Sequence, residues 1–120
     1  MKVLVVEDDW LVRAGAVDAL EEAGFQVIEA ATGEEAMSVC RERVADALVT
    51  DIMLGGKIDG WDIAEHCRSS DPTLPVIYVT GYSFPQHRPV AGSRVFYKPY
   101  NAEKMIAALH DLLGPRTALA

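Results

Sequence analysis

Five short apolar runs divide the chain at regular intervals, and their spacing restricts the folds open to it. The runs lie at Val3–Val6, Phe25–Ile28, Ala47–Thr50, Val76–Val79 and Val95–Tyr97. The stretches between them are mostly long enough for a helix, and parallel strands need such long, right-handed crossovers. The pattern predicts an α/β fold with a doubly wound, five-stranded parallel sheet covered by helices on both faces.

Capping residues mark the starts of the expected helices. These helices are expected at Trp10–Ala23, from Thr32 to about Arg43, at Trp61–Ser69, and from Asn101 to the Gly114-Pro115 stop. The interval between Thr80 and Val95 differs, because Pro85, Pro89 and Gly92 would each interrupt a regular helix. A fourth helix is therefore expected to be short or irregular.

Length and composition set limits on function. The 120 residues suit one domain, and no apolar run approaches the length that would span a membrane. The formal net charge of -7 makes direct binding to nucleic acid unfavourable. Cys40 and Cys67 lie far apart in the sequence, so we expect two buried, reduced thiols.

Charged and hydroxyl side chains follow the predicted strands. Glu7 and Asp8 come after the first strand, Asp51 after the third, Thr80 after the fourth and Lys98 after the fifth. In a sheet of order 2-1-3-4-5 these strand ends meet at one edge, where such folds place their working sites. Clustered carboxylates repel one another, and all-oxygen ligands suit Mg²⁺. The sequence therefore predicts a magnesium site that could also hold a phosphoryl group.

With these residues, the chain resembles the receiver domain of bacterial two-component response regulators, which has a flavodoxin-like fold. The resemblance runs from Lys2 to about Leu113. It rests on the motifs Val5-Val6-Glu7-Asp8-Asp9, Leu48-Val49-Thr50-Asp51-Ile52-Met53-Leu54, Asp59-Gly60, Val79-Thr80-Gly81 and Lys98-Pro99-Tyr100. It implies a receiver domain at residues 1–114 and a frayed tail at residues 115–120.

The resemblance implies roles for the acidic residues. Asp51 would accept the phosphoryl group and, with Asp8 and the backbone carbonyl of Met53, bind Mg²⁺ directly. Glu7, where the family commonly has Asp, would hold the metal through water. Mn²⁺ would be an acceptable substitute for Mg²⁺.

The resemblance also implies which residues bind the phosphoryl group and which transmit the signal. Thr80 and Lys98 would contact the phosphoryl group, and the Lys98–Pro99 peptide bond would be cis. Gly81, Tyr82, Val95 and Tyr97 would belong to the output surface, and Thr80-Gly81-Tyr82 partly matches a receiver subgroup with a degraded fourth helix. Val95 stands where the family usually has an aromatic switch residue, so an inward ring flip is not available.

The loop after Asp51 also departs from the family pattern. Gly55 replaces the usual proline, and the Asp59-Gly60 pair stands one residue later than is common. We expect a longer and looser loop there.

The function implied is a cytoplasmic phosphorelay receiver, not an enzyme. Its partners would be a sensor histidine kinase or a histidine phosphotransfer protein, and a separate downstream effector protein. Three alternatives stay open: a phosphatase or phosphotransferase with an aspartyl nucleophile, a phosphorylation-independent interaction module, and a flavin-binding protein. The sequence does not decide between a stand-alone receiver and one domain of a longer chain.

Overall fold

The computed structural model describes residues 1–81 and 87–114. Its five-stranded parallel sheet has the order β2-β1-β3-β4-β5, which confirms the predicted fold class and strand order. The strands are β1 (Lys2–Val6), β2 (Gln26–Ala30), β3 (Ala47–Asp51), β4 (Val76–Thr80) and β5 (Arg94–Tyr97). The helices are α1 (Trp10–Glu22), α2 (Gly33–Glu42), α3 (Gly60–Ser70) and α4 (Ala102–Leu113).

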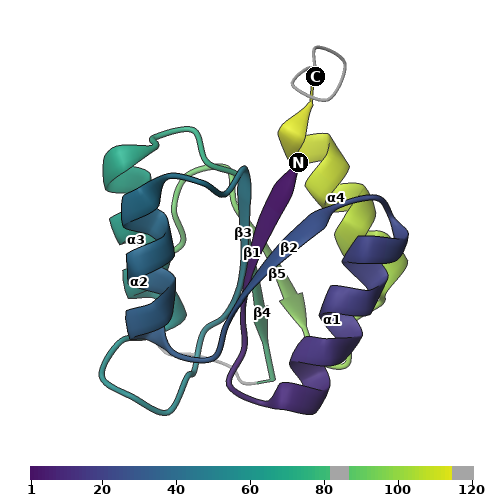
Figure 1. Ribbon diagram of the computed structural model, residues 1–120, viewed down its shortest axis with the longest axis horizontal. Helices are drawn as coiled ribbons and strands as arrows, with labels where there is room; N and C mark the ends of the chain where they lie inside the picture. Colours follow the sequence, from purple (N-terminus) through teal and green to yellow (C-terminus); the bar gives the residue numbers. More distant parts are fainter. Residues whose placement is uncertain (82–86, 115–120) are drawn as a thin grey trace.

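The helices form two layers, with α2 and α3 on one face of the sheet and α1 and α4 on the other (Figure 1). Alternate residues of each strand point to opposite faces, so each strand contributes to two cores. Leu4, Leu48 and Tyr78 pack in the core beneath α2 and α3. Val3 and Ile77 belong to the core beneath α1 and α4.

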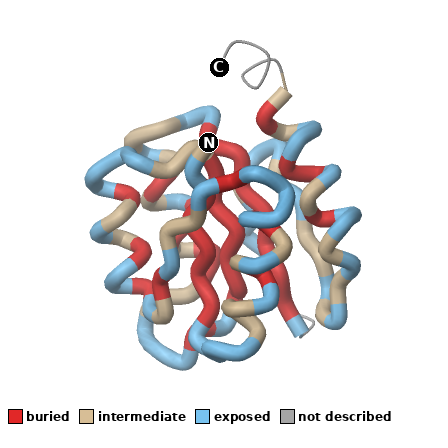
Figure 2. The backbone as a smooth tube through the Cα atoms, turned by 45° about the vertical axis from the view of Figure 1, so that its right-hand side comes forward, coloured by how far each residue is buried: buried red, intermediate tan, exposed pale blue. Residues whose placement is uncertain are grey.

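The central strands are buried along almost their whole length (Figure 2). Every residue of β3 and β4 is buried, whereas β2 and β5 at the edges are partly exposed. Burial on both faces explains why the central strands are continuous apolar runs in the sequence. It also explains why the polar residues of β3 and β4, apart from Thr50, stand at the ends of these strands.

Four N-caps begin the helices where the sequence predicts them. The side chains of Asp9, Thr32, Asp59 and Asn101 each accept a hydrogen bond from a backbone N–H in the first turn of their helix. Asp59 and Asp62 form a reciprocal capping box at the start of α3. The caps set where each helix leaves the edge of the sheet that carries the predicted site.

The connection between β4 and β5 contains no helix in its described part, residues 87–93. For these residues, this agrees with the expectation of a short or irregular fourth helix. Tyr82 and the tail at residues 115–120 lie outside the described residues. In the described part of the chain, no helix is both long and apolar enough to cross a bilayer.

The prediction of two reduced thiols is wrong, because a disulfide joins Cys40 to Cys67. The two residues are 27 positions apart in the sequence, but α2 and α3 pack side by side and bring their Cα atoms to 5.2 Å. That separation lies in the usual range for a disulfide. Sequence spacing alone does not reveal that two neighbouring helices place these residues opposite each other.

Candidate functional site

Three carboxylates meet at the carboxyl edge of the sheet. Glu7 and Asp8 follow β1, and Asp51 is the last residue of β3, which pairs with β1 in parallel register. One carboxylate oxygen from each residue lies within 4.8 Å of the other two. Glu7 and Asp51 are buried, while Asp8 is exposed. The sheet order thus brings together the three acids that the sequence predicts at one site.

Lys98 supplies the positive charge at this site. Its Nζ donates hydrogen bonds to Glu7 Oε1 at 2.6 Å and to Asp51 Oδ2 at 2.9 Å. Burial opposes the charged form of the lysine, but the hydrogen bonds and the negative charges of the two carboxylates together outweigh burial and raise the pKa of Lys98. The peptide bond from Lys98 to Pro99 is cis. The ammonium of Lys98 is thus shared between Asp51, at the end of β3, and Glu7, which follows β1.

Burial disfavours the charged form of the Glu7 carboxyl group. Burial, together with the charge of Asp51, raises the pKa of Glu7 from 4.5 to about 7. Hydrogen bonds from Lys98 and from the backbone N–H of Asp9 oppose that shift without cancelling it. A cation that binds among the three acids would displace the proton of Glu7 into the solvent.

The backbone around Asp51 also holds its carboxylate in place. The N–H of Met53 donates to Asp51 Oδ1 at 3.3 Å, and the hydroxyl of Thr50 donates to the backbone carbonyl of Asp51 at 2.8 Å. The side chain of Met53 is half exposed beside the site. With Lys98 on the other oxygen, both oxygens of the Asp51 carboxylate have hydrogen-bond donors.

The loop after Asp51 returns tightly to the end of β3. The N–H of Gly60 donates to the carbonyl of Ile52 at 2.8 Å. A Cβ at Gly60 would overlap the backbone carbonyl oxygen of Asp51 and lie 2.8 Å from the Cα of Ile52. Only a glycine permits this approach, so the Asp59-Gly60 pair fixes the start of α3 against the strand that carries Asp51. The loop contains Gly55 with φ +75°, and it is anchored at both ends.

Thr80 ends β4, next to β3, and is buried. Its carbonyl accepts a hydrogen bond from the backbone N–H of Lys98 at 2.7 Å, which joins the ends of β4 and β5. Among the residues predicted for output, Gly81 is exposed, Val95 is partly buried, and Tyr97 is about half exposed on the edge strand. Gly81, Val95 and Tyr97 thus lie on or next to the two strands that end in Thr80 and lead into Lys98.

Arg13 is a site residue that the sequence analysis missed. From α1, its guanidinium donates to the backbone carbonyl of Glu7 at 2.7 Å and to Glu29 Oε1 on β2 at 3.0 Å. It therefore fixes the chain where the acidic motif leaves β1. A basic residue one turn after the capping Asp9 was the available signal, but sequence alone does not show which way its side chain turns.

Two arginines and a tyrosine hold the described part of the β4–β5 connection, which sequence analysis also missed. Arg68 of α3 donates to the carbonyl of Ala91 at 2.9 Å, and the hydroxyl of Tyr78 accepts from the N–H of Val90 at 3.1 Å. Arg88, within the connection, pairs with two acids of α3, Asp62 at 2.9 Å and Glu65 at 2.6 Å. Residues 87–93 therefore have no helix but are fastened to α3 and β4.

The donor set of the acidic cluster fits a divalent cation with a preference for oxygen ligands. Three carboxylates lie within reach of one point, and Lys98 compensates one of their charges. Asp8 is open to solvent, so a bound cation could keep water ligands on that side. Hard divalent cations such as Mg²⁺ prefer this combination of ligands.

Comparisons with known proteins agree with this arrangement. A family model for the response regulator receiver domain matches residues 3–110. The response regulator receiver protein CpdR of Brucella abortus is 28% identical over 116 residues, covering 93% of this chain and 96% of CpdR. The sensor kinase CckA of the same organism is 32% identical over 117 residues, covering 92% of this chain and 12% of CckA.

Solved structures of receiver domains are also similar to this chain. A response regulator receiver protein from Sinorhizobium medicae superposes with a TM-score of 0.90 at 28% identity, covering 94% of each chain. The receiver domain of the hybrid histidine kinase CckA has a TM-score of 0.82 at 30% identity, covering 95% of this chain and 100% of that one. With a family model that spans most of its length, and with the acids and the lysine gathered at the predicted edge of its sheet, the chain belongs to the response regulator receiver domain family.

Proposed function

We propose that the chain is a phosphorelay receiver in which Asp51 accepts the phosphoryl group. The observation that carries this assignment is the buried Asp51 carboxylate, which lies within 4.8 Å of carboxylate oxygens of Glu7 and Asp8 and accepts a hydrogen bond from Lys98. A carboxylate oxygen of Asp51 would attack the phosphorus of a phosphohistidine. The new P–O bond forms as the P–N bond breaks, and the leaving imidazole nitrogen takes the electron pair.

The residues that would hold Mg²⁺ are Asp8, Asp51 and the backbone carbonyl of Met53, with Glu7 acting through water. The metal would offset negative charge on the transferring phosphoryl group. Glu7 has a second task, since its carboxylate holds the ammonium of Lys98 near Asp51. Burial raises the pKa of Glu7, and the charge of a bound cation would lower that pKa and drive the proton into the solvent.

Thr80 and Lys98 would bind the phosphoryl oxygens from neighbouring strands. Lys98 is already within hydrogen-bond distance of Asp51, so a phosphoryl group on that carboxylate would compete with Glu7 for its ammonium. Thr80 lies at the end of the strand next to Asp51 and would donate its hydroxyl. Because its carbonyl is bonded to the N–H of Lys98, movement of either residue reaches both strands.

The output surface would lie along these two strand ends and the connection between them. It would include Gly81, Val95 and Tyr97, together with Tyr82 outside the described residues. Val95 packs against the core beneath α2 and α3, and a β-branched side chain has little room to swing there. Output would therefore arise from displacement of the backbone that Tyr78 and Arg68 hold at residues 90–91.

The partners would be a sensor histidine kinase or a histidine phosphotransfer protein as donor, and a separate effector protein as target. We propose a cytoplasmic location, no direct contact with nucleic acid or membrane, and no enzymatic turnover of a separate substrate. The chain covers 96% of CpdR but 12% of CckA. Receiver domains of this length thus occur both as small proteins and as parts of larger ones.

Intact-mass measurement with a small phosphodonor, such as acetyl phosphate, tests the assignment. We expect one added phosphoryl group in the presence of Mg²⁺, none with EDTA, and none in Asp51→Asn. Asp18→Asn, which removes an exposed carboxylate of α1, is the matched control and should label like the unmodified chain. Labelling of Asp51→Asn would refute the acceptor, and no labelling of any variant would favour a phosphorylation-independent module.

A further inference from the structure

The disulfide between Cys40 and Cys67 lies in the helical layer formed by α2 and α3. Cys40 is in the last turn of α2, and Cys67 lies near the end of α3. The acidic cluster lies at the carboxyl edge of the sheet, whereas this pair packs beside Leu4, Leu48 and Leu74, toward the opposite edge. The disulfide is therefore separate from the phosphoryl chemistry.

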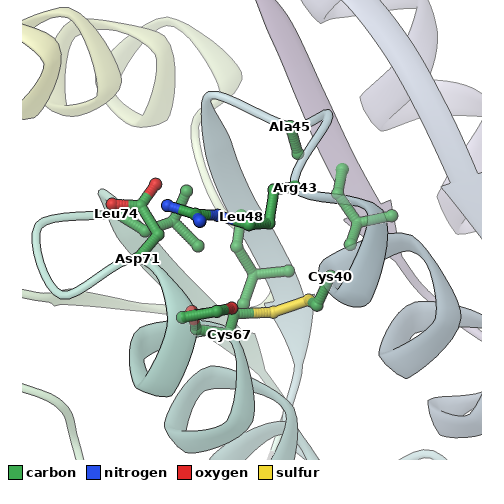
Figure 3. A pocket seen from close by; sticks show the side chains of 9 residues that line it. Cys40, Arg43, Ala45, Leu48, Cys67, Asp71 and Leu74 are labelled. Atoms are coloured by element: carbon green, nitrogen blue, oxygen red, sulfur yellow. A yellow bond between two sulfur atoms is a disulfide. The ribbon is translucent and has the colours of Figure 1, made fainter.

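The disulfide borders a surface pocket. Cys40 and Cys67 line this pocket together with Arg43, Ser70 and Asp71, and the side chain of Arg43 points toward Asp71 across its mouth (Figure 3). Cys40 is 8% exposed and Cys67 is 2% exposed. Both cysteines belong to the buried core beneath α2 and α3, so a thiol would reach the sulfurs when the ends of these helices open at the pocket. The more exposed Cys40 is then the expected point of attack.

The disulfide also lies next to contacts that reach other parts of the domain. Arg68, the residue after Cys67, donates to the carbonyls of Leu74 at 2.7 Å and Ala91 at 2.9 Å. It thus joins α3 to the loop that leads into β4 and to the β4–β5 connection. A restraint on this part of α3 also restrains the segment that Arg68 holds.

We propose that Cys40 and Cys67 form a reversible thiol–disulfide site whose oxidation state sets how firmly α2, α3 and residues 90–92 are held together. The reacting partner is a low-molecular-weight thiol of the glutathione class. Its thiolate attacks the sulfur of Cys40, a mixed disulfide forms, and Cys67 leaves as a thiolate that takes up a proton. A second thiolate attacks the glutathione sulfur of the mixed disulfide, releasing Cys40 as a thiolate and the oxidised dimer of the small thiol. The reverse sequence closes the bond.

The first experiment equilibrates the full chain in buffers of reduced and oxidised glutathione, quenches with acid and measures intact mass. We expect two forms that interconvert with the buffer ratio and differ by the mass of two hydrogen atoms, both monomeric. Accumulation of glutathione adducts, disulfide-linked dimers, or a disulfide that persists in excess reduced glutathione would each overturn the reversible site. A chain that stays reduced in the oxidised buffer would also overturn it.

Hydrogen exchange on the two forms tests the structural consequence. The oxidised form should exchange more slowly at the ends of α2 and α3 and at residues 90–92, with α1 and α4 unchanged as the internal control. Cys40→Ala and Cys67→Ala should each exchange like the reduced form in both buffers. Equal exchange in the two forms of the unmodified chain would overturn the restraint, and this comparison needs no variant to fold. Since the proposal does not involve Asp51, failure of phosphoryl labelling would leave it intact.

Discussion

The pH dependence of stability in the metal-free protein depends strongly on Glu7. Its side chain is 7% exposed and lies 2.6 Å from the ammonium of Lys98. Burial is the main cause that raises the pKa of Glu7 from 4.5 to about 7, and the nearby charge of Asp51 adds to it. In the unfolded chain the same carboxyl is surrounded by water and titrates near 4.5.

The sign of the effect follows from where the proton is held more tightly. The folded state binds it more tightly, so Glu7 favours folding at low pH, and this contribution is lost as the pH rises from about 4.5 through about 7. The full difference corresponds to roughly 3 kcal/mol. Between about pH 5.5 and pH 8 the expected loss is about 2 kcal/mol. Bound Mg²⁺ should remove most of this loss by compensating the carboxylate.

Glu7→Gln tests this reasoning, because the amide keeps the size of the side chain and can still accept a hydrogen bond from Lys98 but does not titrate. Urea unfolding would be measured in EDTA at both pH values. The free energy of unfolding should fall with pH by about 2 kcal/mol more in the unmodified chain than in Glu7→Gln. Taking the difference between the two proteins removes the contribution of groups that titrate in both.

Glu29→Gln is the matched control, since it removes a carboxylate that is about half exposed on the neighbouring strand β2. It should keep the pH dependence of the unmodified chain. If Glu7→Gln shows the same pH dependence as Glu29→Gln, burial does not disfavour the charge of Glu7 and the electrostatic account of the site is wrong.

Three further predictions concern packing and metal binding. Gly60→Ala should destabilise the domain by about 1–3 kcal/mol in urea unfolding, because a Cβ there overlaps the last backbone carbonyl of β3, whereas Gly15→Ala, with open space around its Cβ, should not. Tyr78→Phe should cost about 1 kcal/mol and speed hydrogen exchange of the Val90 N–H, which loses its acceptor; unchanged exchange would contradict the role of that contact. Asp8→Ala should reduce the rise in melting temperature that Mg²⁺ produces, and an equal rise in both proteins would exclude Asp8 as a ligand.

The parallel sheet was predictable from the period of the apolar runs, and the clustering of the acids followed once the strand order of the receiver-like fold was assumed. The continuous apolar runs that make up most of β1, β3 and β4 can only be buried on both faces, and parallel strands place their carboxyl ends together. The positions of residues that directly follow such strands can therefore be predicted without knowing any side-chain contact. The metal and phosphoryl roles of these residues stay predictions.

Contacts between separate elements were not predictable in the same way. Arg68, Arg88 and Tyr78 read as ordinary helix, loop and strand residues, and their partners lie 12 to 26 positions away. Proline and glycine in the connection predicted a short or irregular helix, but they do not indicate which contacts hold residues 87–93 in its place. Here, side-chain hydrogen bonds to backbone groups take the place of the missing helical ones.

In the proposed function, the position of Lys98 would let one site both bind the phosphoryl group and transmit the signal. Its ammonium is divided between Glu7 and Asp51, and its backbone N–H donates a hydrogen bond to the carbonyl of Thr80. Phosphorylation of Asp51 would replace one negative charge with nearly two, and the ammonium would then be drawn from Glu7 toward the phosphoryl group. Glu7 would lose its charge partner at that moment, so a cation near Asp8 would become more necessary. In the proposed function, phosphoryl binding, metal binding and the junction of β4 with β5 would thus be coupled through one side chain, and a change at Asp51 would reach the edge strand without an aromatic switch.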